Sequence, residues 1–491
     1  MPQPFIRGHG RGLSRRRLLA GGVMAVLGLA GGFEAWRGLS GPAASTSSEG
    51  FGIVPNTAPE GTAVLVARPV EVDLGGPVVR TWCYGDGVPG PVLRGRVGDT
   101  LAVRVDNRLP EETTVHWHGL AIPNDMDGVP DLTQSPIPPG GSGTYRFRLP
   151  HPGTYWYHPH VGVQADRGLY GALLVDDPAD PGNYDLELLV VLDDWLDGTG
   201  RSPDDVMRDL RAGGMDMTSR PHSAALGGDG GDVAYPHYLL NGRVPAAPQT
   251  LRARPGQRAR IRIVNAGADT AFRVALGGHR LTVTHSDGFP VRPVTVDTLV
   301  IAMGERYDIQ VRLGDGAFPL VAVPEGKRGE AARAVVRTAG GATPAGDRLP
   351  AELDRRLLRL DDLRATELVA LPPRAPERTH DLVFEGDMMG SGWTINGHTY
   401  DPARALPLRR GEVARLRFIN LSSMFHPVHV HGHTFQVRLG AAQGPRKDTV
   451  IAVPMQTVVA DLVADNPGRW LAHCHNLYHS MSGMMTLLAY G

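Results

Sequence analysis

Cysteine and lysine are both scarce in this chain. Its 491 residues include two cysteines, Cys83 and Cys474, so a disulfide framework is excluded. Lysine occurs only at positions 327 and 447, and the 50 basic and 51 acidic residues nearly cancel. A chain of this charge has no strongly basic face, so nucleic acid is not expected as a partner. After the N-terminal region no apolar run is long enough to cross a bilayer, so no membrane span is expected in the mature chain.

Glycine and proline are abundant instead. The 63 glycines and 41 prolines form about a fifth of the chain, which favours turns and loops over long helices. Strand-like runs, such as residues 144–149 and 281–284, lie between these turns. The sequence therefore predicts an all-β chain, and its length predicts two or more domains.

The N-terminus resembles a twin-arginine export signal. Residues 14–20 read Ser-Arg-Arg-Arg-Leu-Leu-Ala and precede an apolar run of small residues at 21–32. This run is too short to span a bilayer as a mature helix. We expect residues 1–45 to be a signal and linker, and the mature protein to be exported to the periplasm, cell envelope or medium. An arginine-rich tail without a targeting role is the alternative.

A ten-residue pattern occurs three times, at residues 98–107, 256–265 and 411–420. Each copy begins with Gly, continues as a strand of alternating apolar and other residues, and ends with Asn. The copies begin 158 and 155 residues apart, which predicts three copies of one β-sandwich domain. We expect domains at 55–178, 183–340 and 379–491. A linker is expected at 341–378, with a short helix within residues 352–363.

Histidines recur in His-x-His pairs. Nineteen histidines placed at random would give about 0.7 such pairs. The sequence has five, at 116/118, 158/160, 429/431, 431/433 and 473/475. Strand residues i and i+2 share a face about 6.6 Å apart, which suits two neighbouring ions better than one. The matching positions of the middle copy are Val274 and Leu276, so the pattern predicts one multinuclear metal site built by copies one and three.

A second metal site is predicted in the third copy. Cys474 lies between two histidines, so its sulfur leaves the opposite face of the strand. His426, His479 and Met484 complete a thiolate, two imidazoles and a thioether. This set is typical of a blue-copper electron-transfer centre. The first copy lacks equivalent residues, so the site is expected once.

These motifs resemble the four copper motifs of three-domain multicopper oxidases, the laccase-like group. They are His116-Trp-His-Gly, His158-Pro-His, His426-Pro-Val-His-Val-His-Gly and His473-Cys-His-x₃-His-x₄-Met, in the family's order. The resemblance implies three cupredoxin-like Greek-key domains and four copper ions. It also implies oxidation of a one-electron donor, coupled to reduction of dioxygen to water.

The resemblance also implies a ligand for each copper. Type 1 would use His426, Cys474, His479 and Met484, and type 2 would use His116 and His429. One type 3 copper would use His118, His158 and His475, and the other His160, His431 and His473. Asp127 occupies the place of an acid that delivers protons to the reduced oxygen, although a turn former is the alternative reading. Ser480 stands where some relatives have a second acid.

Several interpretations stay open. Phenols or aromatic amines are the leading electron donors, with cuprous ion in copper tolerance as the first alternative and a non-catalytic copper buffer as the second. Met207, Met215 and Met217 form either a cuprous-ion route or an incidental group. His433 is expected either next to the metal ligands, without binding a metal itself, or on the surface. Cys83 is expected as a buried thiol. We expect a monomer.

Overall fold

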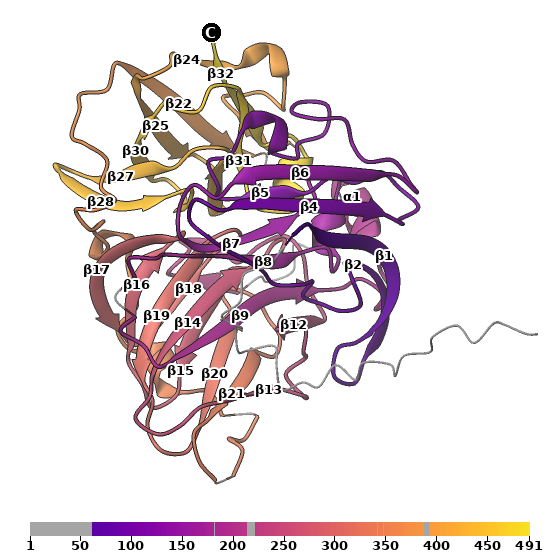
Figure 1. Cartoon of the computed structure of the whole chain (residues 1–491), viewed down its shortest axis with the longest axis vertical. Coiled ribbons are helices and arrows are strands. Elements are labelled where there is room, and N and C mark those ends of the chain that lie inside the picture. The colour runs from indigo at the N-terminus through magenta and orange to yellow at the C-terminus, as the bar shows by residue number, and fades with distance from the viewer. Residues whose placement is uncertain (1–60, 181, 214–220, 341, 347, 387–391) are drawn as a thin grey trace, which may run out of the picture. The chain divides into compact units, whose positions relative to one another are not determined.

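The computed structural model describes residues 61–180, 182–213, 221–340, 342–346, 348–386 and 392–491. The predicted signal and linker at 1–45 therefore lie outside the described residues, as do Met215 and Met217. Figure 1 shows that strands dominate the described chain, which confirms the all-β prediction. Within the described ranges, no helix is both long and apolar enough to cross a membrane.

The first two sheets come from residues 63–176, drawn in indigo and purple in Figure 1. One has the order β2-β1-β4-β6, formed by β1 (Ala63–Asp73), β2 (Val78–Tyr84), β4 (Thr100–Asn107) and β6 (Ser142–Arg148). The other has the order β3-β8-β7-β5, formed by β3 (Leu93–Arg96), β5 (His116–His118), β7 (Gly153–His158) and β8 (Gly171–Asp176).

The next two large sheets come from residues 186–337. The order β12-β9-β14-β19-β16-β17 uses β9 (Leu186–Trp195), β12 (His237–Leu240), β14 (Arg258–Asn265), β16 (Leu281–Ser286), β17 (Phe289–Val296) and β19 (Arg306–Arg312). The order β13-β21-β20-β15-β18 uses β13 (Gln249–Arg252), β15 (Phe272–Leu276), β18 (Leu299–Ile301), β20 (Ala317–Pro324) and β21 (Ala332–Arg337). A small hairpin joins β10 (His222–Ser223) and β11 (Gly228–Asp229).

The last two sheets come from residues 378–490. The order β23-β22-β25-β30-β27-β28 uses β22 (Arg378–Glu385), β23 (Thr394–Ile395), β25 (Val413–Asn420), β27 (Phe435–Leu439), β28 (Ala442–Lys447) and β30 (Thr457–Val463). The order β24-β32-β31-β26-β29 uses β24 (Leu406–Leu408), β26 (His426–Val430), β29 (Thr449–Ala452), β31 (Arg469–Cys474) and β32 (Met485–Tyr490).

The ten-residue repeat forms the same strand in each set of sheets. β4, β14 and β25 each pair in parallel with the first long strand of their set and antiparallel with a later strand. In β25 the apolar Leu416 and Phe418 are buried, while Arg417 is exposed. β14 differs, because Arg260 and Arg262 are only 4% and 2% exposed and pair with buried carboxylates. The middle strand is therefore buried on both faces rather than on one.

Helices are short. The α-helices are α1 (Pro203–Arg211) and α2 (Leu477–Met481), and the 3-10 helices are η1 (Asn124–Met126), η2 (Gln164–Asp166), η3 (Ala351–Asp354), η4 (Leu360–Asp362) and η5 (Pro402–Arg404). The single linker helix expected within 352–363 is wrong, because two separate 3-10 turns occur there. Met207 belongs to α1 and is 5% exposed in the core of the middle sheets, so it does not lie in a polar loop.

Candidate metal centres

The His-x-His motifs lie on strands that pair with each other. β5 pairs with β7, which places His116 opposite His158, and β26 pairs with β31, which places His429 opposite His473. The two strand pairs come from sheets at opposite ends of the sequence. Their rings nevertheless meet, since His116 stacks on His431 with centroids 3.9 Å apart and His118 stacks on His429 at 3.8 Å.

Eight histidines form three groups, of which the first two share His118. In each group the candidate ligand atoms lie within 4.8 Å of one another. The groups are His116, His118 and His429, then His118, His158 and His475, and finally His160, His431 and His473. The structure thus brings together all eight histidines that the sequence placed at the multinuclear site.

Several ring nitrogens in these groups have no hydrogen-bond partner among the described residues. They are His116 Nε2, His118 Nδ1, His158 Nε2, His429 Nε2 and both nitrogens of His475. Buried polar atoms are normally paired, so a set of orphaned nitrogens aimed at one place points to a bound cation. Burial also holds the pKa of His158 and His475 well below the usual value. Neutral imidazoles are the form that binds metal, so the residues fit a metal cluster.

Two buried carboxylates orient the rings. Asp127 Oδ2 accepts from His431 Nδ1 at 2.9 Å, and Asp127 Oδ1 lies 3.2 Å from His116 Nδ1. Asp448 Oδ1 lies 3.2 Å from His118 Nε2, which leaves Nδ1 of that ring for a metal. Although burial opposes it, Arg306 holds the pKa of Asp448 well below its usual value. Fixing the second nitrogen in this way sets the tautomer of a metal-binding histidine. Asp127 was predicted from the sequence motifs, whereas Asp448 follows none of them.

The cysteine-centred group is separate from the histidine cluster. Cys474 Sγ lies 3.5 Å from His426 Nδ1 and 3.6 Å from His479 Nδ1, and all three residues are fully buried. Met484 is also fully buried, and its carbonyl accepts from Cys474 N at 3.1 Å. Burial raises the pKa of the Cys474 thiol, so a thiolate there needs a bound cation. A thiolate with two imidazoles favours copper.

The Nε2 atoms of His426 and His479, which face away from the Cys474 sulfur, also have hydrogen-bond partners. His426 Nε2 lies 2.7 Å from Ser422 Oγ, and His479 Nε2 donates to Asp232 Oδ2 at 2.9 Å. Trp393 stacks on the His479 ring with centroids 3.9 Å apart. Ser422, Asp232 and Trp393 were not found from the sequence, because each is brought to the site by folding and none follows a local spacing rule.

One strand end joins the two centres. Cys474 belongs to the cysteine-centred group, while its neighbours His473 and His475 belong to two different histidine groups. His473 Nδ1 also donates to the carbonyl of Cys474 at 2.8 Å. The alternation of side chains along β31 therefore sends consecutive residues to different centres.

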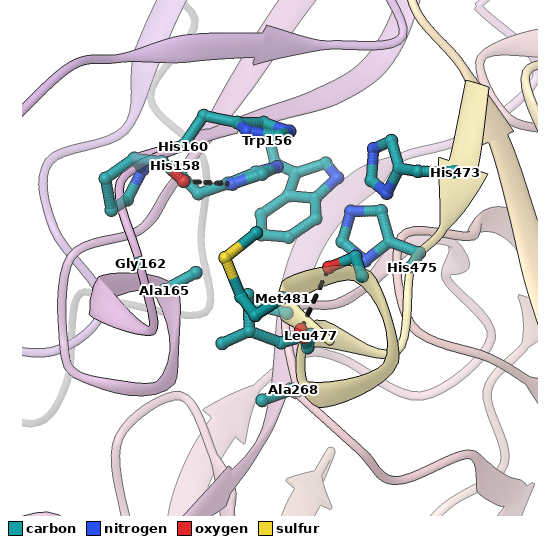
Figure 2. A pocket seen from close by; sticks show the side chains of 14 residues that line it. Trp156, His158, His160, Gly162, Ala165, Ala268, His473, His475, Leu477 and Met481 are labelled. Carbon is teal, nitrogen blue, oxygen red and sulfur yellow. Dashed lines mark hydrogen bonds between the residues drawn. The ribbon is translucent and has the colours of Figure 1, made fainter. Parts of the chain in front are cut away.

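A small cavity reaches the histidine cluster. Figure 2 shows His158 and His160 on one side, His473 and His475 on the other, and Trp156 between them. The cavity volume is about 20 Å³, enough for about one water-sized molecule. Gly162, Ala165 and Ala268 line it, with Met481 beside them. Ser480 also lines the cavity, and its hydroxyl donates to the carbonyl of Leu477.

His433 and both cysteines are buried. His433 is 3% exposed and lies 2.6 Å from the Tyr490 hydroxyl, so it lies inside the protein and not on the surface. Both cysteines are free, and Cys83 is fully buried as predicted.

Known proteins are similar to this chain in sequence over most of its length. Three models of the multicopper oxidase family match residues 68–180, 187–341 and 372–491. The chain is 46% identical to Multicopper oxidase MmcO of Mycobacterium tuberculosis over 99% of both chains. It is 30% identical to a Copper resistance protein A homolog of Pseudomonas syringae pv. tomato, over 86% of this chain and 90% of that protein. The crystal structure of a multi-copper oxidase from Pseudomonas thermotolerans matches with a TM-score of 0.70 at 29% identity, covering 89% of this chain and 100% of that one.

The fold and these matches define a class of protein. Three cupredoxin-like β-sandwich domains with buried histidine and cysteine groups are those of a copper-dependent oxidoreductase that uses dioxygen as acceptor. The chain belongs to the multicopper oxidase family, in its laccase-like group. The resemblance drawn from the sequence motifs is therefore confirmed.

Proposed function

We propose that the protein holds four copper ions, with each ligand assigned to one ion. The type 1 copper takes His426, Cys474, His479 and Met484, and the type 2 copper takes His116 and His429. The two type 3 coppers take His118, His158 and His475, and His160, His431 and His473. The observation that carries this assignment is the junction on β31, where Cys474 and its two flanking histidines belong to different centres.

Bound copper supplies one-electron redox chemistry and a place for dioxygen to bind. The chain contributes the path between the centres, because Cys474 is covalently joined to His473 and His475. It also contributes neutral imidazoles whose orientation is fixed by outer hydrogen bonds, such as those of Asp127 and Asp448. The cavity beside His160 and His473 supports access of dioxygen to the histidine cluster.

We assign the proton transfer to Asp127. Reducing dioxygen to two waters requires four protons, and Asp127 is a buried acid that contacts rings of two histidine groups. Ser480 lines the cavity at the position of the second acid of some relatives, and a hydroxyl cannot replace a carboxyl as a proton donor near neutral pH. Proton delivery therefore depends on Asp127.

Phenols and aromatic amines are the proposed electron donors. The laccase-like family membership supports this donor class, and we propose His479 as the ligand through which electrons enter. Cuprous ion is a second candidate, supported by the similarity to the Copper resistance protein A homolog. Met207 gives no support to a cuprous-ion route, because it is buried in the core of the middle sheets.

The remaining proposals concern the whole chain. We propose domains at 55–178, 183–340 and 379–491 with a linker at 341–378, export through the N-terminal signal, and a monomer. Limited proteolysis, secretion of a fusion to the first 45 residues, and sedimentation test these three points in turn.

The function is tested by measuring how many electrons the donor gives up for each dioxygen molecule consumed. The copper-loaded protein is given a phenol or Cu(I), and donor oxidation and oxygen consumption are followed together. Four electrons removed per dioxygen consumed is the expected ratio for reduction to water. Two electrons per dioxygen, which would indicate peroxide release, contradicts the proposal. The ratio of the two kcat/KM values decides between the donor classes.

A further inference from the structure

A loop of the middle sheets contacts the helix that carries His479. The Leu477 N–H donates to the carbonyl of Ala268 at 2.9 Å, and Asn476 Nδ2 donates to Asp269 Oδ1. The N-terminal end of helix α2 is therefore held by hydrogen bonds to Ala268 and Asp269. Neither residue belongs to any of the four copper motifs.

Asp269 is the centre of this contact. Its side chain is fully buried and accepts from four donors, which come from three segments of the chain. The donors are Asp232 N at 3.1 Å, Val233 N at 2.9 Å, Lys327 Nζ and Asn476 Nδ2. A carboxylate has about four acceptor positions, so this one is saturated and fixed in place.

These bonds form part of a closed hydrogen-bond network that includes His479 of the cysteine-centred group. Asn476 Oδ1 caps α2 by accepting from Tyr478 N and His479 N. His479 in turn donates from Nε2 to Asp232 Oδ2 at 2.9 Å. Asp269 thus bonds to Asn476, which caps the helix that carries His479. It also bonds to the backbone N–H of Asp232, whose carboxylate accepts from the His479 ring.

We propose that Asp269 is a positioning residue for electron entry. Its carboxylate holds Asp232 against His479 Nε2 and so fixes the ring through which the donor's electron enters. This inference rests on the assignment of His479 to the type 1 copper. Asp269 itself contacts no candidate ligand atom in the described structure, so it acts through Asp232 and Asn476.

Asp269→Asn provides a nearly isosteric test. An amide nitrogen cannot accept a hydrogen bond, so half of the acceptor capacity is lost and the Lys327 charge is left without its carboxylate. We expect the absorption maximum and the EPR spectrum of the type 1 copper to shift. Anaerobic bleaching of the blue band by a phenol should slow on the order of tenfold, because small displacements at an electron-entry site are costly.

Asp308→Asn is the matched control. Asp308 is another buried aspartate of the middle sheets, and it accepts from Arg260, Arg262 and Thr154 away from the cysteine-centred group. It should lower the melting temperature while leaving the blue band and the bleaching rate unchanged. If Asp269→Asn behaves in the same way, the residue has only a structural role and the proposal is wrong.

A double-variant cycle tests the route of action. If Asp269 acts through Asp232, adding Asp269→Asn to Asp232→Asn should not slow the bleaching of the blue band any further. If the bleaching rate of the double variant falls by the product of the two single losses, this route of action is wrong. Asn476→Ser keeps a helix cap but shortens the reach to Asp269, so it gives a second readout if Asp269→Asn does not fold. It should shift the EPR spectrum in the same direction, and an unshifted spectrum overturns the proposal. A wild-type protein without a blue band would instead refute the type 1 assignment itself.

Discussion

The two cysteines show what distinguishes a metal-binding thiol from a packed one. Both are fully buried, and burial raises the pKa of Cys83 to about 12. The sulfur of Cys83 donates to the carbonyl of Gly85, whereas the sulfur of Cys474 faces two imidazole nitrogens. Burial is therefore common to both, and the two imidazoles distinguish Cys474 as the proposed copper-binding thiol.

Cys474→Ser should abolish the blue band and donor oxidation, because a hydroxyl does not replace the thiolate that gives the charge-transfer absorption. Copper in the histidine cluster should remain, since all eight histidines are intact. Metal analysis and visible absorption check this result. Cys83→Ser is the matched control and should stay blue. Loss of the histidine-bound copper in Cys474→Ser would show that the two centres do not load independently.

Asp127→Asn should slow oxygen reduction by about 10²-fold, because the side chain keeps its size but loses its titratable proton. Reduction of the type 1 copper by donor should change far less. Stopped-flow experiments separate the two, with anaerobic bleaching of the blue band for the first step and reoxidation by dioxygen for the second. A loss confined to bleaching would assign Asp127 to donor access or folding instead.

The candidate ligands were predictable because they follow local spacing rules. His-x-His on a strand and the Cys474 to Met484 spacing are visible in the sequence alone. Asp448, Asp232 and Asp269 were missed, because each reaches its histidine or helix from a distant segment of the chain. No local spacing rule marks such residues in the sequence, because only the folded chain brings them to the site.

Each repeat strand ends with an asparagine that organises the turn after it. Asn265 Nδ2 donates to the carbonyls of Thr270 and Ile301, and its Oδ1 accepts from Gly267 N. Asn107 and Asn420 make the equivalent three bonds in the other two copies. In the second and third copies the side chain also ties the turn to the opposite sheet, because Ile301 and Ala452 belong to β18 and β29.

Asn265→Ala should lower the free energy of unfolding by on the order of 3 kcal/mol, because two buried carbonyls and one N–H lose their partner. Chemical denaturation measures this loss. Asn183→Ala, at an exposed position, is the control and should change the free energy by less than about 0.5 kcal/mol. Equal, small effects would mean that the asparagines are replaceable turn formers.

Helix α1 was missed although a local signal was present. Ser202 and Asp205 form a capping box, and Pro203 occupies the first turn. No helix was expected at residues 203–211, because glycines and acidic residues are frequent around this segment. The linker shows the reverse error, since the leucine spacing within residues 352–363 suggested one helix where the chain forms two 3-10 turns.

The middle copy has none of the His-x-His pairs, yet its described residues contact both centres. Arg306 pairs with Asp448 beside the histidine cluster, and Asp269 bonds to Asn476 beside the cysteine-centred group. A Cβ at Gly304 would lie 3.0 Å or less from the rings of His118 and His475. The middle copy therefore helps to hold the candidate ligands of the other two.

Acid should destabilise the folded chain before its carboxylates titrate fully. Burial lowers the pKa of His151, His285 and His433 to about 4, against about 6.5 in an unfolded chain. The unfolded state therefore binds more protons below pH 6.5, and the free energy of unfolding falls as the pH drops from about 6.5 to 4. Thermal unfolding across this range measures the slope. His151→Gln should make it shallower, and an unchanged slope would exclude His151 as a contributor.

The central claim is that two separate copper centres are joined through Cys474 and its neighbours. Metal analysis of the purified protein together with its visible spectrum tests this most directly. We predict four coppers per chain and an intense blue band from the Cys474 thiolate. A colourless protein that holds zinc, or one that holds copper without the blue band, would contradict the account.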